Sequence, residues 1–255
     1  MKLVSWNVNS LNVRQDHVLD FLRSNQPDVL CLQELKLESA KFPLAKIQEA
    51  GYHAVFDGQK TYNGVAIISK NAASDVTTGM PNYADEQKRV ITATVDGVRI
   101  ICVYIPNGQD VESDKYQYKL GFLAALVPYI RDQLTLHPKL ALLGDFNIAP
   151  ADADVHNPAA WAGQVLCTEP ERAAFRALQE LGLQDSFRLF SQAEKLFSWW
   201  DYREMGFRRN IGLRIDHIML SPPLAEKCVA ASIDKAPRKL ERPSDHAPVI
   251  AEISQ

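Results

Sequence analysis

The segment Leu140-Ala141-Leu142-Leu143-Gly144-Asp145-Phe146-Asn147 begins with four consecutive apolar residues and then turns polar. A short, continuous apolar run is typical of a β-strand that is covered on both faces. Functional side chains in sheet proteins gather where strands meet loops, and this strand is followed directly by Asp145 and Asn147. The segment therefore predicts a buried strand with a candidate site at its carboxyl end.

Strand-length runs rich in valine and isoleucine recur along the whole chain, at residues 3–8, 28–32, 65–68, 90–95, 99–105, 215–220 and 249–253. Helical patterns lie between them, at residues 18–22, at residues 113–136, where Pro128 is expected to kink or divide the helix, and from Thr168 onward. Thr168 and Glu171 match a capping box, and Gly182 lies where the helix should end. Strands that alternate with helices indicate an α/β fold with a mixed sheet, and the simplest organisation is one domain over residues 1–255.

Composition and charge restrict the class of protein. The chain has 28 basic and 31 acidic residues, a formal net charge of -3, although residues 203–242 carry a local net charge of +4. Phosphate binding depends on where charges lie, so this balance leaves a nucleic-acid enzyme open, and the local excess is equally compatible with an ordinary solvated surface. Four widely spaced cysteines, no signal-peptide pattern and no membrane-spanning run favour a reduced, cytoplasmic protein without a zinc site; the cysteines are Cys31, Cys102, Cys167 and Cys228.

Several other strand runs end in polar residues that suit a metal ion. Glu34, Asp245 and the amide of Asn7 are hard oxygen ligands, the type that Mg²⁺ or Mn²⁺ prefers. Each group taken alone has an ordinary explanation as a turn or a cap. Their repetition at strand ends predicts a metal site.

The remaining polar residues match the needs of phosphodiester hydrolysis. Tyr104 and Asn147 can donate hydrogen bonds to phosphate oxygens, and Asp145 can accept a proton from water. His246, if oriented by Asp216, can hold positive charge beside a phosphate. Because no serine or cysteine nucleophile belongs to the set, the residues indicate direct attack by water.

The ordered set resembles the endonuclease/exonuclease/phosphatase superfamily, and within it the bacterial exonuclease III and AP endonuclease group. Four segments carry the wider resemblance: Trp6-Asn7-Val8-Asn9, Leu32-Gln33-Glu34, Gly144-Asp145-Phe146-Asn147 and Ser244-Asp245-His246-Ala247-Pro248. Four more carry the closer one: Gly58-Gln59-Lys60, Tyr104-Ile105-Pro106-Asn107-Gly108, Phe197-Ser198-Trp199-Trp200-Asp201-Tyr202-Arg203 and Gly212-Leu213-Arg214-Ile215-Asp216. The resemblance implies a four-layered α/β sandwich, with two mixed β-sheets packed face to face and helices outside.

The resemblance also implies an activity and a division of roles. Glu34 would be the main Mg²⁺ ligand, with Asn7 and Asp245 near the ion. The catalytic set would be Tyr104, Asp145, Asn147, Asp216 and His246. The substrate would be double-stranded DNA with abasic sites or with blocked or recessed 3′ ends, bound by a monomer.

Contacts to DNA are expected mainly from the segment 197–203. Trp199 resembles the aromatic residue that packs on an extruded abasic sugar, although two tryptophans in a row also suit a core strand. Arg214 could hold a backbone phosphate or be an internal structural residue. The expected DNA contacts are Trp199, Arg203, Asn107, Lys60 and Arg209. Two alternatives remain at this point: a small-molecule phosphoesterase of the inositol-phosphate or sphingomyelinase type, and an inactive nucleic-acid-binding relative.

Overall fold

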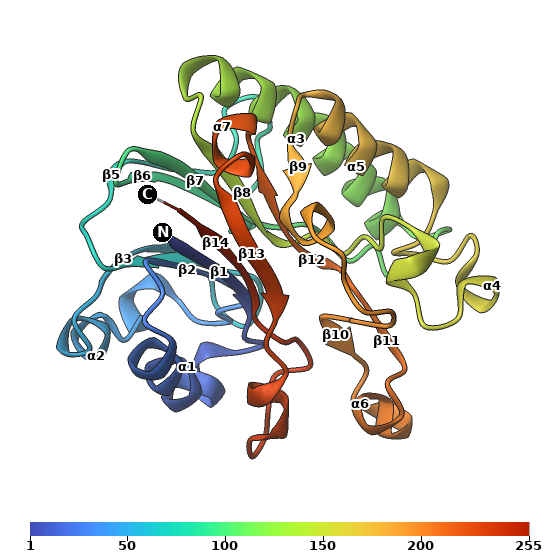
Figure 1. Ribbon diagram of the computed structural model, residues 1–255, viewed down its shortest axis with the longest axis horizontal. Helices are drawn as coiled ribbons and strands as arrows, with labels where there is room; N and C mark the ends of the chain where they lie inside the picture. Colours follow the sequence, from blue (N-terminus) through green and yellow to red (C-terminus); the bar gives the residue numbers. More distant parts are fainter. Residues whose placement is uncertain (255) are drawn as a thin grey trace.

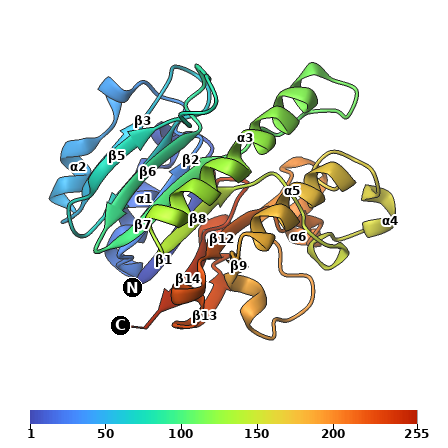
Figure 2. The same ribbon diagram turned by 90° about the horizontal axis from the view of Figure 1, so that it is seen from above.

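Two six-stranded mixed sheets pack against each other in the computed structural model, which describes residues 1–254 (Figures 1 and 2). The first sheet has the order β13 (Cys228–Ile233), β14 (Val249–Ile253), β1 (Lys2–Asn7), β2 (Val29–Gln33), β4 (Val65–Ser69) and β3 (His53–Asp57). The second has the order β5 (Ser74–Thr78), β6 (Val90–Val95), β7 (Val98–Tyr104), β8 (Leu140–Asp145), β12 (Asp216–Leu220) and β9 (Gln184–Asp185). A separate two-stranded ribbon joins β10 (Trp199–Trp200) to β11 (Gly212–Leu213).

Helices form the two outer layers. Figure 1 shows α1 (Leu11–Asn25) and α2 (Leu44–Glu49) on the outside of the first sheet, and α3 (Asp114–Leu136) and α5 (Glu169–Glu180) on the outside of the second. Shorter helices lie in the connections: α4 (Pro158–Trp161), α6 (Gly206–Arg209) and α7 (Pro222–Ala225). Single 3₁₀ turns are η1 (Ser39–Lys41), η2 (Asp152–Asp154), η3 (Ser186–Leu189), η4 (Arg203–Met205) and η5 (Ala236–Lys239).

Three apolar clusters fill the spaces between these layers. The central cluster joins side chains of both sheets, such as Ile67 and Ile100, and the outer two join each sheet to its helices, as Trp6 does on one side and Phe146 on the other. Alternate residues of the central strands therefore pack on opposite layers, which explains why these strands read as continuous apolar runs. The predicted four-layered sandwich is confirmed.

The start and the end predicted for the helix from Thr168 onward are confirmed. The capping box of Thr168 and Glu171 starts α5, and Gly182 follows its last turn with a φ of 100°. The prediction for Pro128 was wrong in one respect, because α3 runs undivided over 23 residues. Pro128 lacks the N–H that would bond the carbonyl of Ala124, and the packing of α3 on the second sheet tolerates this single loss.

Strand register places the polar ends of the strands together. The parallel pair β1–β2 aligns Asn7 with Gln33, and the parallel pair β7–β8 aligns Tyr104 with Asp145. The antiparallel neighbour β12 sets Asp216 opposite Asp145. Gly144 is required here, because a Cβ atom at this position would lie 2.0 Å from the carbonyl oxygen of Val103. Within residues 1–254, none of the helices has the length and apolar character needed to cross a membrane.

Candidate active site

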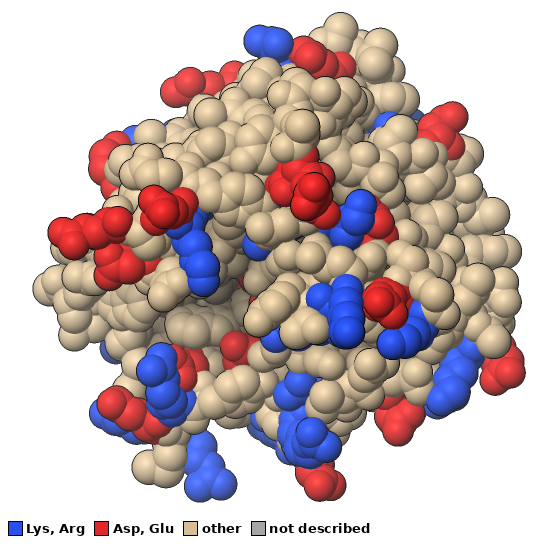
Figure 3. Space-filling model, turned by 180° about the vertical axis from the view of Figure 1, so that it is seen from behind, with Lys and Arg blue, Asp and Glu red and all other residues tan. Residues whose placement is uncertain are grey.

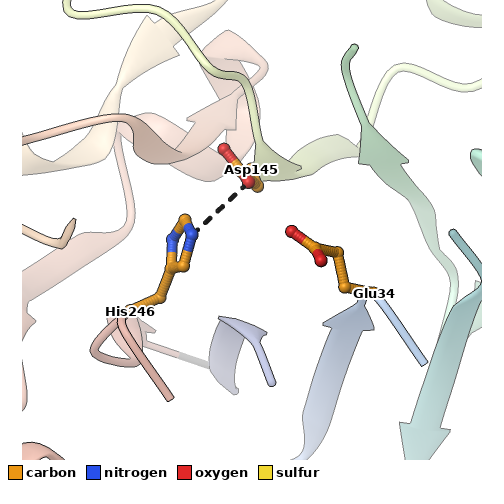
Figure 4. Close-up of side chains that lie close together, drawn as sticks. All are labelled: Glu34, Asp145 and His246. Atoms are coloured by element: carbon orange, nitrogen blue, oxygen red, sulfur yellow. Dashed lines mark ion pairs between the residues drawn. The ribbon is translucent and has the colours of Figure 1, made fainter. Parts of the chain in front are cut away.

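Three side chains from distant parts of the chain meet at one end of the sandwich. Glu34 follows β2, Asp145 ends β8 and His246 precedes β14, and a ligand atom of each lies within 4.8 Å of those of the other two (Figure 4). His246 and Asp145 are 4% and 1% exposed, so both are shielded from bulk water. The two sheets together build this cluster, because each contributes a carboxylate.

His246 lies between two aspartates. Its Nδ1 is 2.9 Å from Oδ2 of Asp216, and its Nε2 is 3.7 Å from Oδ2 of Asp145. Burial by itself would lower the pKa of His246, but the charges of Asp216 and Asp145 outweigh it and raise the pKa to about 10. Burial raises the pKa of Asp145 to about 7, opposed mainly by the neighbouring His246. These shifts favour a protonated His246, which forms an ion pair with Asp145 at 3.7 Å, too far for a hydrogen bond.

Asn7 connects the two carboxylates of the cluster. Its Nδ2 donates to Oε1 of Glu34 at 2.8 Å and to Oδ2 of Asp145 at 2.9 Å. Its Oδ1 accepts the backbone N–H of Asn9 at 2.9 Å. In this arrangement Asn7 aligns the two acids through its nitrogen, whereas the sequence-based hypothesis used its oxygen as a metal ligand.

Asn147 is held by hydrogen bonds on every side. Its Nδ2 donates to the carbonyl of Ile105 at 3.0 Å, and its Oδ1 accepts from Nδ2 of Asn107 at 3.0 Å. Its backbone N–H donates to Oδ1 of Asp145 at 2.9 Å. The amide is therefore fixed beside Asp145, whose Oδ2 accepts the second Nδ2 hydrogen at 3.3 Å.

The turns that carry these side chains use left-handed backbone. The φ angles are 44° at Asn9, 53° at Glu34, 53° at Lys36 and 50° at Asn147. Residues other than glycine lose about 1–3 kcal/mol in such conformations. Strain of this kind, repeated around one cluster, marks a site whose geometry is maintained by the surrounding fold.

Tyr104 lies at the edge of the cluster, with the guanidinium of Arg89 4.7 Å from its ring centre. Burial raises the pKa of the Tyr104 hydroxyl well above its usual value, and the charges of Glu34 and Asp145 add to the effect. The hydroxyl therefore stays protonated and is available as a hydrogen-bond donor.

Asp245 and Trp199 form a second group beside the first. Nε1 of Trp199 donates to Oδ2 of Asp245 at 3.0 Å, and Nδ2 of Asn9 donates to its Oδ1 at 2.9 Å. Trp199 is half-buried, whereas Trp200 is fully buried in the core. Trp200 is therefore a core residue, and the contact of Trp199 with DNA stays a prediction.

The basic residues of the expected DNA surface are placed unequally. Arg203 is exposed and pairs with Asp201 at 2.5 Å, and Arg209 lies 3.7 Å from Glu204. Lys60 is exposed in the loop before β4. Arg214 is an internal structural residue instead, because it is 1% exposed and enclosed by its ion pairs with Asp154 and Asp185, both at 2.7 Å.

One cation of the site was not found from the sequence. Nζ of Lys36 lies 2.9 Å from Oε2 of Glu34 and 2.6 Å from Oδ1 of Asn9. The only sequence signal is a lysine two residues after Glu34, which ordinary surface composition also explains. Lys36 shows that a positive charge is stabilised next to Glu34.

The donor set fits a hard divalent cation. Glu34 and Asp145 supply carboxylate oxygens, and no cysteine belongs to the cluster, a chemistry that favours magnesium or manganese over softer metals. Nζ of Lys36 already holds a positive charge 2.9 Å from Oε2 of Glu34, and a divalent ion can replace it there. The cluster is therefore a possible metal site whose principal ligand would be Glu34.

Comparison with known proteins agrees with the geometry. Residues 4–246 match the model of the Endonuclease/Exonuclease/phosphatase family. Exodeoxyribonuclease III of Haemophilus influenzae is 38% identical over 99% of both chains. The 3′ phosphatase NExo from Neisseria, solved with product DNA hairpin, is 51% identical with a TM-score of 0.98, and an AP endonuclease from Archaeoglobus fulgidus is 38% identical with a TM-score of 0.96; both comparisons cover 100% of both chains. The chain belongs to the endonuclease/exonuclease/phosphatase family and is a hydrolase of the exodeoxyribonuclease III and AP endonuclease type.

Proposed function

We propose that this protein hydrolyses phosphodiester or phosphomonoester bonds of double-stranded DNA at 3′ ends and at abasic sites, with Mg²⁺ as the metal. The convergence of Glu34, Asp145 and His246 from three separate strand ends is the observation that carries the proposal. The 51% sequence identity with a 3′ phosphatase supports processing of 3′ ends, and the 38% sequence identity with an AP endonuclease supports incision at abasic sites.

When bound, Mg²⁺ would supply positive charge to neutralise the phosphate and to stabilise the leaving oxygen. Glu34 would hold it, with Asp245 and Asn7 at the edge of the site. Asp145 aligns the attacking water and accepts its proton, since its carboxylate is fixed by Asn7 and by the turn at Asn147.

Three donors would stabilise the five-coordinate phosphate. Tyr104 would face it as a neutral hydrogen-bond donor, and His246 would provide positive charge that Asp216 maintains. Asn147 would donate to it by exchanging one of its Nδ2 bonds, to Ile105 or to Asp145, for the phosphate. These groups are preorganised by contacts within the protein, which is the arrangement that lowers the barrier for charge development.

Recognition of DNA would use the segment around Trp199. The half-buried indole offers an apolar surface to a sugar without a base, and Asn107 lies beside the phosphate-binding amide. Arg203, Arg209 and Lys60 are exposed and would contact the backbone. Figure 3 shows a hollow in the surface with Lys and Arg side chains at its rim.

The test compares Glu34→Gln and Asp145→Asn with the parent protein on three duplexes: one with an internal abasic site, one with a recessed 3′ end and one with a 3′-phosphate. Each substitution should reduce kcat by at least about 100-fold, the scale of removing a catalytic acid–base or charge-stabilising group. Glu38→Gln is the matched control, since Glu38 is exposed and pairs with Lys41. Near-normal rates for both site variants would contradict the assignment.

Assaying the parent protein also on inositol phosphates and sphingomyelin, with and without the duplexes, separates the alternatives. A small-molecule phosphoesterase would hydrolyse inositol phosphates or sphingomyelin faster than DNA and would not be inhibited by duplexes. An inactive relative would bind DNA without cleavage. We propose residues 1–255 as one functional domain, because the proposed site needs both sheets. We also propose that the protein acts as a monomer. Its four free cysteines support a cytoplasmic location.

A further inference from the structure

A second arginine, Arg238, is buried close to the site without a carboxylate partner. It lies in η5 and is 6% exposed. Its Nη1 donates to the carbonyl of Ser244, and its Nε has no hydrogen-bond partner among residues 1–254. Guanidinium groups in such surroundings are costly to desolvate, so the protein must compensate for this charge in another way.

Aromatic rings provide that compensation. The guanidinium carbon of Arg238 lies 4.8 Å from the ring centre of Phe207, 5.7 Å from that of Tyr202 and 5.8 Å from that of Trp200. A desolvated cation over an aromatic face is attracted by the ring quadrupole. Arg238 therefore lies inside a cage made by the aromatic segment, which we define as residues 197–207.

The other partner of Arg238 belongs to the catalytic loop. Ser244, whose carbonyl it binds, precedes Asp245 and His246. The Oγ of Ser244 donates to the carbonyl of Asn7 at 2.7 Å and accepts the backbone N–H of His246 at 3.2 Å. One side chain thus contacts both the aromatic segment and the loop that bears the site.

Hydrogen bonds also hold the aromatic segment at its start, where the carbonyl of Ser198 accepts the N–H of Ala247 at 2.7 Å and Nε1 of Trp199 donates to Asp245 at 3.0 Å. The strand β10 has two residues, and the backbone N–H of Trp200 donates to the carbonyl of Asp245 at 3.1 Å. On the exposed side, the hydroxyl of Tyr202 donates to the carbonyl of Pro243 at 2.7 Å, and Arg14 donates to the same carbonyl at 3.0 Å. The guanidinium of Arg238 adds a buried contact with the rings of Trp200, Tyr202 and Phe207.

We infer that Arg238 is a positioning residue that fixes the aromatic segment against the Ser244–His246 loop and so sets the place of Trp199 beside the reacting phosphate. The inference rests on the proposed function for its effect on DNA. His246 and Asp145 are held independently by Asp216 and Asn7. Loss of Arg238 should therefore weaken recognition of the substrate while the chemistry of bound substrate stays close to normal.

The first experiment measures KM and kcat on abasic and 3′-phosphate duplexes with Mg²⁺. Arg238→Met should raise KM about tenfold and change kcat by less than about twofold, since a desolvated cation–π cage and its carbonyl bond contribute on this scale. Arg238→Lys should stay close to Arg238→Met, because lysine keeps the charge but not the planar group that contacts three rings. Lys239→Ala, which removes the exposed neighbouring cation, is the matched control and should keep KM near that of the parent.

Two further measurements keep the inference open to refutation. If Arg238→Met does not fold, Phe207→Leu removes the nearest ring from a half-buried position and should raise KM in the same way. Hydrogen exchange, measured without DNA, should show faster exchange of the Trp200 amide in Arg238→Met and no change in Lys239→Ala. This second readout does not depend on the substrate, so it tests Arg238 even if the parent protein fails to cleave DNA.

The inference would be overturned by normal KM in a folded Arg238→Met protein, by full rescue with lysine, or by unchanged exchange at Trp200. A loss of kcat at constant KM would also refute it, because Arg238 would then act on the chemistry.

Discussion

Replacing His217 with glutamine should remove one acid-sensitive contribution to the stability of the fold. His217 is 1% exposed, and its Nε2 lies 2.9 Å from the carbonyl of Ile148. Its Nδ1 lies 3.1 Å from Nη1 of Arg214, which can only donate. The ring must therefore be neutral, with its proton on Nε2, because a proton on Nδ1 would face the guanidinium.

The size of this contribution to the free energy of unfolding follows from the pKa of His217. Burial, with the charge of Arg214, lowers the pKa of His217 from its ordinary 6.5 to about 4. In the unfolded chain the imidazole gains a proton below about pH 6.5, whereas the folded one does not until about pH 4. The unfolded state thus binds more protons in this window, and the stabilising contribution is complete above pH 6.5 and lost as the pH falls toward 4. The full difference is about 3 kcal/mol, of which about 2 kcal/mol is lost between pH 7 and pH 5.

Urea unfolding at pH 7 and pH 5, in EDTA, measures this difference. Between pH 7 and pH 5 the free energy of unfolding of the parent protein should fall by about 2 kcal/mol more than that of His217→Gln. The glutamine amide can accept from Arg214 and donate to Ile148 without titrating. His53→Gln, on the exposed edge of the first sheet, should behave like the parent. Equal losses in the parent and in His217→Gln would refute the reasoning.

Three other changes have definite expected results. Lys119→Met should lower the free energy of unfolding by about 3–5 kcal/mol in a urea titration, since it leaves the fully buried carboxylate of Glu171 without its cationic partner. Adding Glu171→Gln should recover part of this loss, and a clearly smaller loss in Lys119→Met alone would contradict the prediction. Gly144→Ala should abolish soluble, folded protein in expression and circular dichroism, because its Cβ would overlap the carbonyl of Val103. Trp199→Ala should weaken binding of an abasic duplex about tenfold in fluorescence anisotropy, the scale of one lost stacking contact; unchanged affinity would exclude Trp199 from the interface.

The central strands and the main helix starts could be predicted from local patterns because burial on both faces selects continuous apolar residues. The edge strands could not. β5 (Ser74–Thr78) is exposed along its whole length and carries one apolar residue. β3 (His53–Asp57) and β13 (Cys228–Ile233) do contain apolar residues, but a short apolar run does not by itself separate a strand from a piece of helix. The continuous helix through Pro128 was missed for a related reason, since tertiary packing of α3 overrides the local cost of proline.

The candidate site was likewise predicted in part from the sequence and decided in part by the tertiary structure. The residue types at the strand ends identified Glu34, Asp145, Asn147 and His246 as a set, and the structure places them together. Their chemical roles stay predictions until the variants are measured. Lys36 was not predicted, because its contact with Glu34 depends on a left-handed turn that no local pattern announces.

By itself, the sequence determined an α/β fold with a mixed sheet and the chemical character of the site, because strand patterns and the placement of acids, amides and histidine are local properties of the chain. The four-layered arrangement was predicted from the resemblance to the family. Only the tertiary structure decided which charges are paired. Arg214 and Arg238 are alike in the sequence as basic residues of one segment, yet one is enclosed by Asp154 and Asp185 and the other by three aromatic rings. The partner of a buried charge is chosen by packing between segments distant in the chain, and that choice has no signature in either segment alone.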